Sequence, residues 1–387
     1  MSEAWDQWID GRIADLEEAE LLRELRPLSA ESAVRVEADG RALTLFSTND
    51  YLGLSSHPAV RRAVERAVRR HGMGPRGSPL ICGYTDEHER LERSLSSLEM
   101  TEATLLCPTG FAANLAVLSS LAGPQTAIFS DELNHASIID GCRLAARRGA
   151  EIQVYDHADV GSLEEAMAAS DAPRKLVVTD SVFSMEGDLA PLDEIAAVKN
   201  QHDALLVIDE AHGTLVLGES GAGASERFGV SEEVDINVGT LSKAVGALGG
   251  FVSTSERLRT WLFNRGRSYV YSTAAPVPVV AAARAGLETA ADQPQLRRRL
   301  GSHIERLAEA VGRPFATPII PIIVGQEAEA LTASAELFER GIHCTAIRPP
   351  TVPPGTARLR VTLSAAHTEG DIDRLIEALD ELGLLET

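Results

Sequence analysis

The segment at residues 204–213 reads ALLVIDEAHG and decides the fold class. Five apolar residues in succession are typical of a strand that is buried on both faces, as strands are in a parallel sheet between helices. Three polar residues then follow: Asp209, Glu210 and His212. Because ligands bind beyond the carboxyl ends of strands in open α/β sheets, the segment predicts a buried strand with a site at its end.

Similar apolar runs recur between residues 103 and 254, with helical stretches between most of them. The predicted strands are Thr104–Cys107, Ala127–Phe129, Ile152–Tyr155, Lys175–Thr179, Ala204–Ile208, Ile236–Val238 and Gly250–Ser253. This alternation predicts an α/β fold with a largely parallel sheet.

The flanking segments have a different rhythm. Before this region we predict an amphipathic helix at 4–26 that ends at Pro27, a strand Ala42–Ser47, and helices at 58–71 and 86–99. After it we predict a helix Ala281–Val311 with a break at Pro294, strands Ile319–Val324, His343–Ile347 and Arg358–Thr362, and helices at 327–340 and 370–382. We therefore expect an N-terminal arm (1–48), a large α/β domain (49–282) and a small α+β domain (283–387).

Composition excludes some classes of protein. The 387 residues include 57 Asp and Glu against 36 Lys and Arg, a net charge of -21. Nucleic acids and anionic membranes both require a basic surface, so we expect neither as a partner. No apolar run reaches the roughly 18 residues of a membrane span, and the acidic N-terminal stretch is unlike a secretory signal. The four cysteines lack C-x-x-C spacing, which favours reduced thiols in a cytoplasmic protein.

Polar residues stand at the ends of five predicted strands. They are the turn Pro108–Asn114 that opens a helix, then Ser130, Asp131, Asn134 and His135, then Asp180, Ser181 and Ser184, then Asp209, Glu210 and His212, and finally Gly239, Thr240, Ser242 and Lys243. Taken singly, Asp209 could cap a helix and His135 could be a structural histidine. Five such ends together favour a functional site.

Lys243 suggests the chemistry of this site. The chain has three lysines, Lys175, Lys199 and Lys243, and the last precedes an apolar, glycine-rich run that a surface lysine does not need. A lysine amine can condense with an aldehyde. Pyridoxal phosphate needs such a lysine, a carboxylate at its ring nitrogen, an anion cradle and a flat group over its ring. The residues that could supply the rest are Asp209, the turn Thr109–Phe111 with Thr240 and Ser184, and His135, while His212 could reach the phenolic oxygen.

Other chemistries fit less well. The letters DEAH at 209–212 occur in helicases, but the segment around Lys243 lacks the second glycine and the following hydroxyl of a phosphate-binding loop. A metal hydrolase using Asp209, His212 and His135 has no H-E-x-x-H motif or cysteine pair to support it, so we expect no metal. A serine hydrolase would require G-x-S-x-G. A non-catalytic binding protein with an idle cofactor site stays open, although an intact Lys243 argues against it.

Six motifs in order resemble those of the α-oxoamine synthases, which are fold-type I pyridoxal-phosphate enzymes, over nearly the whole chain. They are NDYLGL at 49–54, TGFAAN at 109–114, NHAS at 134–137, DSVFSMEGD at 180–188, DEAHG at 209–213 and TLSK at 240–243. The resemblance implies an aspartate-aminotransferase-like fold. Its large domain would hold a mostly parallel seven-stranded sheet, its small C-terminal domain would be α+β, and the protein would be a homodimer.

The resemblance also implies roles for matching residues. Lys243 would carry the cofactor, Asp209 would pair with the ring nitrogen, His212 with the phenolic oxygen, and His135 would stack on the ring and contact substrate. Gly110 and Phe111 would offer backbone N–H groups to the phosphate, with Ser184 and Thr240 nearby and Thr273 reaching the neighbouring subunit's phosphate. Arg348 would hold the amino-acid carboxylate, and Thr351 and Arg23 would contact substrate.

The segment Thr345–Arg360 points to one branch of the family. Its stretch IRPPTVP is typical of the member that joins L-alanine to a pimeloyl thioester with loss of CO₂, in biotin biosynthesis. The pimeloyl group would arrive on coenzyme A or on acyl carrier protein. Glycine-using relatives, 2-amino-3-ketobutyrate ligase and 5-aminolevulinate synthase, are the alternatives. The chain departs from the family at Arg76–Pro79, where a glycine-rich loop is usual, which leaves the acyl carrier open.

Overall fold

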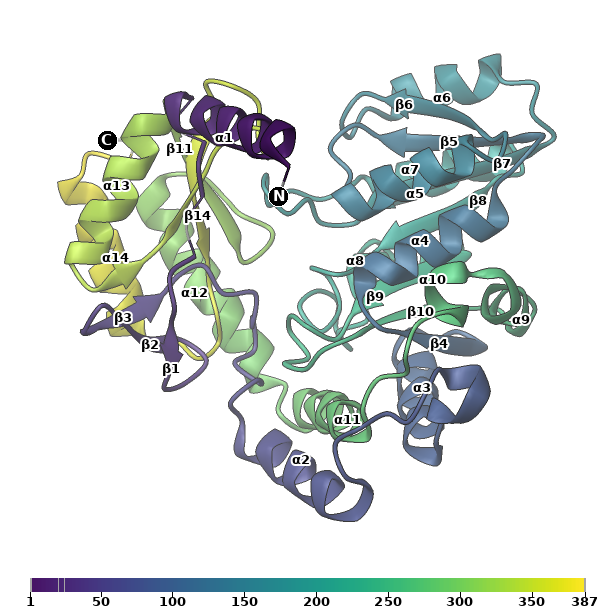
Figure 1. Ribbon diagram of the computed structural model, residues 1–387, viewed down its shortest axis with the longest axis horizontal. Helices are drawn as coiled ribbons and strands as arrows, with labels where there is room; N and C mark the ends of the chain where they lie inside the picture. The colour runs from purple at the N-terminus through teal and green to yellow at the C-terminus, as the bar shows by residue number, and fades with distance from the viewer. Residues whose placement is uncertain (1, 20, 24, 386–387) are drawn as a thin grey trace. The chain divides into compact units, whose positions relative to one another are not determined.

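The computed structural model describes residues 2–19, 21–23 and 25–385, and the chain divides into two compact units (Figure 1). One unit consists of residues 49–301, and the other consists of residues 1–48 together with 302–387. The N-terminal and C-terminal segments thus share a unit. The domain limits predicted from the sequence, at residues 48 and 282, stay a prediction.

The unit of residues 49–301 is built on a seven-stranded sheet in the order β4-β10-β9-β8-β7-β5-β6. Its strands are β4 (Ala103–Cys107), β5 (Thr126–Asp131), β6 (Glu151–Tyr155), β7 (Arg174–Asp180), β8 (Leu205–Asp209), β9 (Ile236–Thr240) and β10 (Gly250–Thr254). Within this sheet β10 runs antiparallel to both of its neighbours, and the remaining pairs are parallel. The predicted mostly parallel seven-stranded sheet is confirmed.

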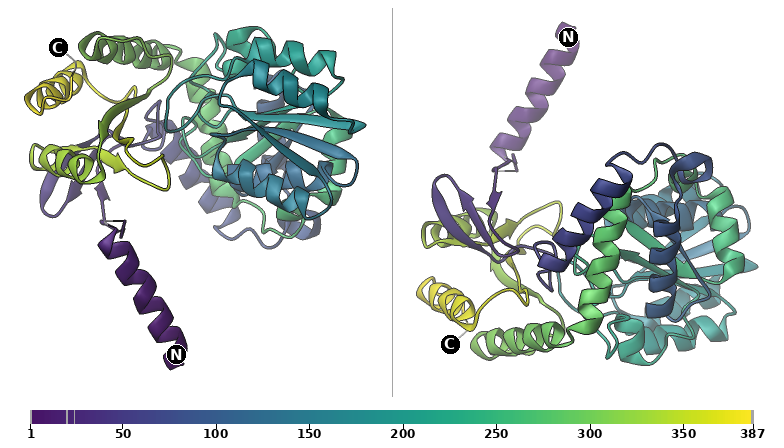
Figure 2. Two further views of the ribbon diagram at one scale, coloured as in Figure 1. Left: turned by 90° about the horizontal axis from the view of Figure 1, so that it is seen from above. Right: turned by 90° about the horizontal axis from the view of Figure 1, so that it is seen from below.

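Helices cover both faces of this sheet (Figure 2). The helices of this unit are α2 (Pro58–His71), α3 (Asp86–Leu98), α4 (Gly110–Leu121), α5 (Ala136–Ala146), α6 (Val160–Ala169), α7 (Leu192–Gln201), α8 (Ala224–Phe228), α9 (Glu256–Arg265), α10 (Arg267–Val270) and α11 (Val277–Asp292), with a short π-helical turn η1 (Pro79–Gly83). Among them, α2 packs on α11. Central strand residues such as Val178, Val207 and Val238 are fully buried. Burial on both faces explains why these strands are continuous apolar runs in the sequence.

The second unit contains two small sheets. In the first, β1 (Ser29–Ala30), β2 (Arg35–Ala38), β3 (Arg41–Leu45) and β12 (Ile342–His343) lie side by side. In the second, β14 (Ala357–Thr362) lies between β11 (Ile319–Gly325) and β13 (Thr345–Ile347). The helices are α1 (Glu3–Glu18), α13 (Glu327–Glu339) and α14 (Glu369–Glu381). Helix α12 (Gln295–Val311) spans the boundary between the units, and its residues from 302 onward belong to this one.

Two contacts join the ends of the chain within this unit. The Arg35 guanidinium lies 2.6 Å from the Asp371 carboxylate, which is 4% exposed as a side chain. The Phe46 ring stacks on the His367 ring with centroids 4.3 Å apart.

The structure corrects two details of the predicted elements. The first helix ends at Glu18 and not at residue 26, because the N–H groups of Leu21 and Leu22 both donate to the Leu16 carbonyl and close the last turn. No residue of α1 is buried, so packing does not extend this helix. The predicted strand His343–Ile347 is split, because His343 pairs with Leu45 in one sheet and Thr345 pairs with Arg360 in the other.

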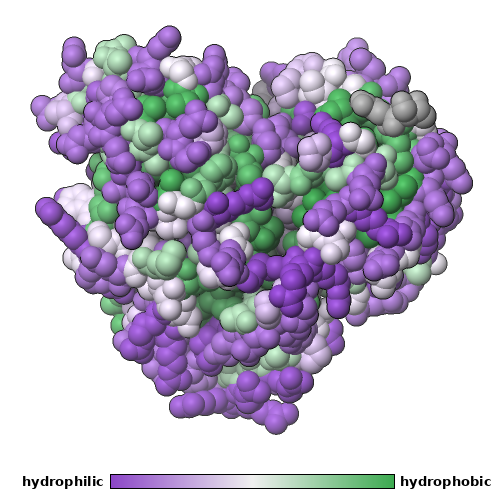
Figure 3. Space-filling view, turned by 180° about the vertical axis from the view of Figure 1, so that it is seen from behind, coloured by the Kyte–Doolittle hydropathy of each residue, from purple (hydrophilic) through white to green (hydrophobic). Residues whose placement is uncertain are grey.

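Hydrophilic side chains cover most of the face seen in Figure 3. Among the described residues, no helix is long and apolar enough to cross a membrane.

Candidate active site

The polar residues predicted at the strand ends lie in the unit of residues 49–301. Strands β5, β7, β8 and β9 are parallel neighbours, so the residues that follow them come to the same edge of the sheet. The register places Asp180 directly opposite Asp209. The sheet therefore brings together a lysine, two histidines and several carboxylates that are far apart in the sequence.

An anion cradle forms where β4 passes into α4. Thr109 caps the helix, its side chain accepting a hydrogen bond of 3.0 Å from the Ala112 N–H. The N–H groups of Gly110 and Phe111 belong to the first turn and have no partner within the helix, so they are suited to bind an anion. A Cβ atom at Gly250 would come within 2.4 Å of the Gly110 nitrogen, so glycine alone lets β10 pack against this turn.

Thr240 ends β9 beside the cradle. A Cβ atom built on Gly110 would lie 3.5 Å from the Thr240 Cβ. The Thr240 hydroxyl donates to the Gly249 carbonyl at 2.9 Å and lies 2.7 Å from the Ser242 hydroxyl. These bonds hold the turn that leads from the sheet to Lys243.

Lys243 belongs to a line of hydrogen-bonded groups. Its Nζ atom lies 2.9 Å from Nε2 of His212, and Nδ1 of His212 lies 2.7 Å from the hydroxyl of Tyr51. That hydroxyl is also 3.2 Å from the Asn49 side-chain oxygen, and Tyr51 is fully buried. Asn49 and Tyr51 of the NDYLGL motif therefore help to orient the Lys243 amine through His212.

Asp209 is held by two donors. Its Oδ1 accepts from the Ala211 N–H at 2.8 Å, and its Oδ2 accepts from the Asn114 side-chain amide at 2.6 Å. The residue is 6% exposed, so its carboxylate keeps one orientation. Such a carboxylate is the kind of group that a protonated ring nitrogen requires.

His135 caps helix α5, and its backbone N–H donates to the Asp180 carboxylate at 2.8 Å. Its ring meets the Phe111 ring edge to face, with centroids 6.4 Å apart. Partial burial lowers the pKa of His135; the Lys243 charge adds to this effect and the Asp209 charge opposes it. Burial, with the Asp209 charge adding to it, raises the pKa of Asp180 well above its usual range.

Ser184 lies in the turn between β7 and α7. A histidine that the sequence did not single out holds this turn: His157 lies 3.1 Å from the Asp131 carboxylate and 3.0 Å from that of Asp188. Hydrogen bonds to these two carboxylates raise the pKa of His157 to about 10, against the effect of burial. The imidazole is therefore charged at neutral pH and joins the end of β5 to the Ser184 turn.

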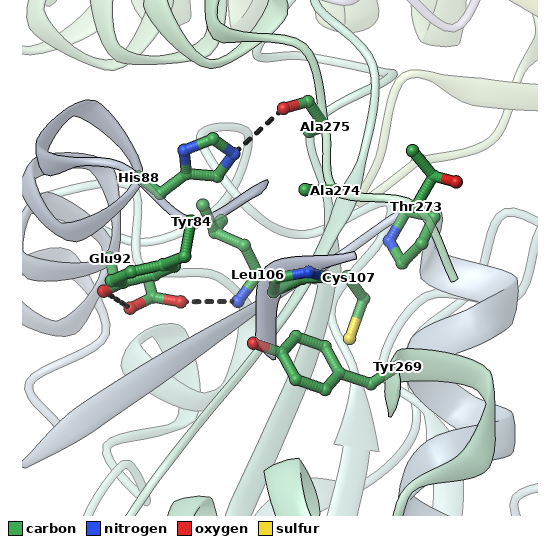
Figure 4. Close-up of a pocket in the computed structure, with 11 residues that line it drawn as sticks. Tyr84, His88, Glu92, Leu106, Cys107, Tyr269, Thr273, Ala274 and Ala275 are labelled. Carbon is green, nitrogen blue, oxygen red and sulfur yellow. Dashed lines mark hydrogen bonds between the residues drawn. The ribbon is translucent and has the colours of Figure 1, made fainter. Parts of the chain in front are cut away.

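The remaining predicted residues lie elsewhere. Arg23, Arg348 and Thr351 belong to the unit of residues 1–48 and 302–387, where all three line one groove of about 510 Å³. Thr273 is exposed and lines a small pocket in the other unit, near Tyr84, Glu92 and Leu106 (Figure 4).

In that pocket the Glu92 carboxylate accepts hydrogen bonds from the Tyr84 hydroxyl at 2.7 Å and the Leu106 N–H at 3.0 Å (Figure 4). Glu92 thereby pairs a backbone group on the edge strand β4, just before the anion cradle. Among the described residues, no group of three His, Cys, Asp or Glu side chains is placed to hold a metal ion.

Comparisons with known proteins agree on one family. The model of class I and II aminotransferases matches residues 41–379. The 8-amino-7-oxononanoate synthase of Arabidopsis thaliana is 49% identical, over 88% of this chain and 74% of the relative, and that of Geobacter sulfurreducens is 43% identical over 97% of each chain. This chain belongs to the 8-amino-7-oxononanoate synthase family. The resemblance read from its motifs is confirmed.

Solved structures of relatives share the fold. Serine palmitoyltransferase of Sphingomonas wittichii superposes with a TM-score of 0.92, at 32% identity over 99% of each chain. The 8-amino-7-oxononanoate synthase of Francisella tularensis superposes with a TM-score of 0.75, at 30% identity over 88% of this chain and 96% of that one. The predicted fold-type I architecture is therefore confirmed.

Enzymes of the 8-amino-7-oxononanoate synthase family depend on pyridoxal phosphate, and a related serine palmitoyltransferase has been solved with it. The residues of this chain fit that cofactor. The chain offers a partly exposed lysine amine, a buried and doubly anchored carboxylate, and a helix N-terminus whose close packing against Gly250 leaves its N–H groups in a fixed place. These are of the kinds that the cofactor needs for its aldehyde, ring nitrogen and phosphate, and the His135 ring is a flat group of the fourth kind.

The structure adds residues that sequence reasoning missed. Tyr51 and Asn114 stand in motifs that carry the family resemblance, but their roles depend on contacts with His212 and Asp209, which are 161 and 95 residues away. The Asn114 amide donates to a carboxylate, a group that can only accept hydrogen bonds. This contact is visible only in the folded chain.

Proposed function

We propose that this chain condenses L-alanine with a pimeloyl thioester. The products are 8-amino-7-oxononanoate, CO₂ and the free carrier thiol, so the new bond joins the alanine Cα to the thioester carbonyl carbon and the alanine carboxylate is lost. The observation that carries the proposal is the convergence of Lys243, Asp209 and the α4 N-terminus at one sheet edge. The proposal is supported by identities of 43% and more to synthases of that name.

Each residue at the sheet edge has a task in this reaction. Pyridoxal phosphate, when bound, links covalently to an amine and draws into its ring the electron pair left at the amino-acid Cα. Lys243 holds the cofactor and its amine removes the Cα proton of alanine. Asp209 keeps a proton on the ring nitrogen. The His212 Nε2 atom, hydrogen-bonded to the lysine amine, orients that amine for the transfer.

The first turn of α4 binds the phosphate through the N–H groups of Gly110 and Phe111, with the hydroxyls of Ser184 and Thr240 nearby. His135 lies against the ring and contacts the substrate. These assignments rest on the strand-end positions of the residues and on their match to the family motifs.

The groove of the other unit serves the substrates. Arg348 binds the carboxylate of alanine, because a guanidinium can form two parallel hydrogen bonds with a carboxylate. Arg23 and Thr351 line the same groove and contact substrate. We also infer that the protein is a cytoplasmic homodimer in which Thr273 reaches the phosphate bound by the partner.

The direct test supplies the purified protein with pyridoxal phosphate, L-alanine and pimeloyl-CoA, and follows 8-amino-7-oxononanoate by mass spectrometry. The same assay with pimeloyl-acyl carrier protein decides the carrier, and glycine with acetyl-CoA tests the 2-amino-3-ketobutyrate ligase alternative. We expect product with alanine and none from Lys243→Ala. Product with glycine alone would move the chain to another branch, and no product from any pair would support a non-catalytic binding protein.

A further inference from the structure

A connected line of four buried or half-exposed polar groups joins Asp209 to His135. The amide of Asn114 donates to the Asp209 carboxylate at 2.6 Å and to the Ser137 hydroxyl at 2.9 Å. The Ser137 hydroxyl in turn lies 2.7 Å from Nδ1 of His135. Asn114 and Ser137 are each 1% exposed. The Asn114 amide on helix α4 therefore contacts the Asp209 carboxylate directly and is linked to the His135 imidazole through the Ser137 hydroxyl.

The donors in this line decide its direction. A carboxylate oxygen only accepts, so the NH₂ group of Asn114 must face Asp209. The amide oxygen of Asn114 is then left buried, with no hydrogen-bond partner in the part of the chain that the structure describes. An unpaired buried acceptor is costly, and an aliphatic side chain would avoid it. The amide at this position is therefore explained by the two bonds that its NH₂ group makes.

The same reasoning places the proton of His135. The backbone N–H of Ser137 donates to Nδ1 of His135 at 3.2 Å, and a backbone N–H cannot accept. Nδ1 must then carry a lone pair. The Ser137 hydroxyl lies 2.7 Å from Nδ1 and accepts from Asn114, so its own proton is available to this lone pair. The neutral ring consequently carries its proton on Nε2.

We propose that Asn114 is a positioning residue that sets the Asp209 carboxylate and orients the Ser137 hydroxyl toward His135, whose Nε2–H tautomer the Ser137 backbone N–H requires. The ring then offers the site a hydrogen-bond donor rather than an acceptor. The importance of this arrangement for catalysis rests on the proposed function, whereas the tautomer itself does not.

The tautomer is measured directly on the full-length protein. Histidine is labelled with ¹⁵N, and the signals of His135 are identified by their loss in His135→Gln. In the wild type we expect the chemical shifts of a protonated Nε2 and an unprotonated Nδ1, both before and after addition of pyridoxal phosphate. In Asn114→Leu the Ser137 backbone N–H still requires a lone pair on Nδ1, so the Nε2–H tautomer should persist. The Ser137 hydroxyl loses the amide that orients it, so the chemical shift of Nδ1 should change.

Affinity for pyridoxal phosphate gives a second readout. Loss of a hydrogen bond to a charged group should raise the Kd of Asn114→Leu by about tenfold or more. Asn237→Ala is the control, because Asn237 in β9 is also 1% exposed and also has an unpaired buried side-chain oxygen, and no described hydrogen bond links its side chain to Asp209 or His135. Its Kd and its His135 shifts should match the wild type.

If Asn114→Leu does not fold, Ser137→Ala and Ser137→Thr take its place. We expect the His135 Nδ1 shift to change in the alanine variant and to return in the threonine variant, which keeps the hydroxyl. A protonated Nδ1 in the wild type would overturn the proposal. So would unchanged His135 shifts together with unchanged cofactor affinity in folded Asn114→Leu. Failure of the proposed reaction alone would leave the tautomer result standing.

Discussion

The amine of Lys243 lies 2.9 Å from Nε2 of His212. This contact links the residues that follow β9 to those that follow β8. The other ring nitrogen of His212, Nδ1, lies 2.7 Å from the Tyr51 hydroxyl. His212 therefore orients the Lys243 amine, and the Tyr51 hydroxyl in turn orients the His212 ring. A group that must first hold a cofactor and then accept a proton benefits from such support.

The first prediction concerns the Tyr51 hydroxyl, which is hydrogen-bonded to His212. Tyr51→Phe keeps the ring but deletes the hydroxyl that contacts His212. Since a hydrogen bond contributes about 0.5–1.5 kcal/mol, we expect kcat to fall by roughly three- to tenfold. Steady-state assays of alanine turnover measure this change, and circular dichroism should show an unaltered fold. An unchanged kcat in Tyr51→Phe would mean that the hydroxyl does not support Lys243.

The second prediction concerns the anion cradle. In Gly250→Ala the added Cβ would lie 2.4 Å from the Gly110 nitrogen, so the first turn of α4 must move. We expect affinity for pyridoxal phosphate to fall by about tenfold or more, since the N–H donors lose their placement. Gly301→Ala in helix α12 is the control, because a Cβ there meets no atom within 4 Å. Cofactor titration should show Gly301→Ala equal to the wild type, and equal binding by Gly250→Ala would refute the cradle.

The third prediction concerns Glu99, which is 2% exposed and has both carboxylate oxygens unpaired among the described residues. Burial raises the pKa of Glu99 well above the ordinary value of a glutamate carboxyl, and the charges of Glu210 and Glu226 add to this effect. The folded chain therefore holds this proton more tightly than the unfolded chain, so stability falls as the pH rises above the unfolded pKa.

Glu99→Gln removes the group that must stay protonated, so it should stabilise the chain by about 1–2 kcal/mol at pH 8 and by less at pH 5. Urea denaturation at the two pH values measures the difference. Exposed Glu65→Gln on α2 is the control and should change neither value. A loss of stability in Glu99→Gln at pH 8 would contradict this reading of the buried carboxyl.

The fourth prediction concerns the His157 bridge between Asp131 and Asp188. The pKa of His157 is raised to about 10 in the folded chain, from 6.5. Its stabilising effect is therefore complete below pH 6.5 and is lost as the pH rises toward 10. We expect His157→Gln to be less stable than the wild type at pH 6, with the gap narrowing steadily by pH 9. A gap that is the same at both pH values would mean that the charge of His157 is not the cause.

Much of the fold could be predicted because of how the sheet is buried. Strands such as β8, covered on both faces, appear in the sequence as continuous apolar runs, and polar residues mark their ends. The length of α1 could not be predicted, because Trp5 and Trp8 have the spacing of a packed helix but remain exposed. The split between β12 and β13 depends on pairing with two different sheets, which local sequence does not encode.

The gathering of the candidate site residues at one edge of the sheet could also be predicted. Lys243, Asp209 and His212 follow strands and carry reactive groups, so their positions alone indicated a role. Asn114, Tyr51 and His157 act through partners that folding brings near, and no spacing rule links them to those partners. Supporting residues of this kind emerge only from tertiary contacts.

Lys243 is proposed to carry the cofactor, and because the chain has three lysines the modified residue can be identified directly. The protein is loaded with pyridoxal phosphate, reduced with borohydride, digested, and analysed by mass spectrometry for the peptide that bears the cofactor. We predict modification at Lys243 and none at Lys175 or Lys199, the other two lysines of the chain. Modification at either of those residues, or no modified peptide from fully loaded protein, would contradict it.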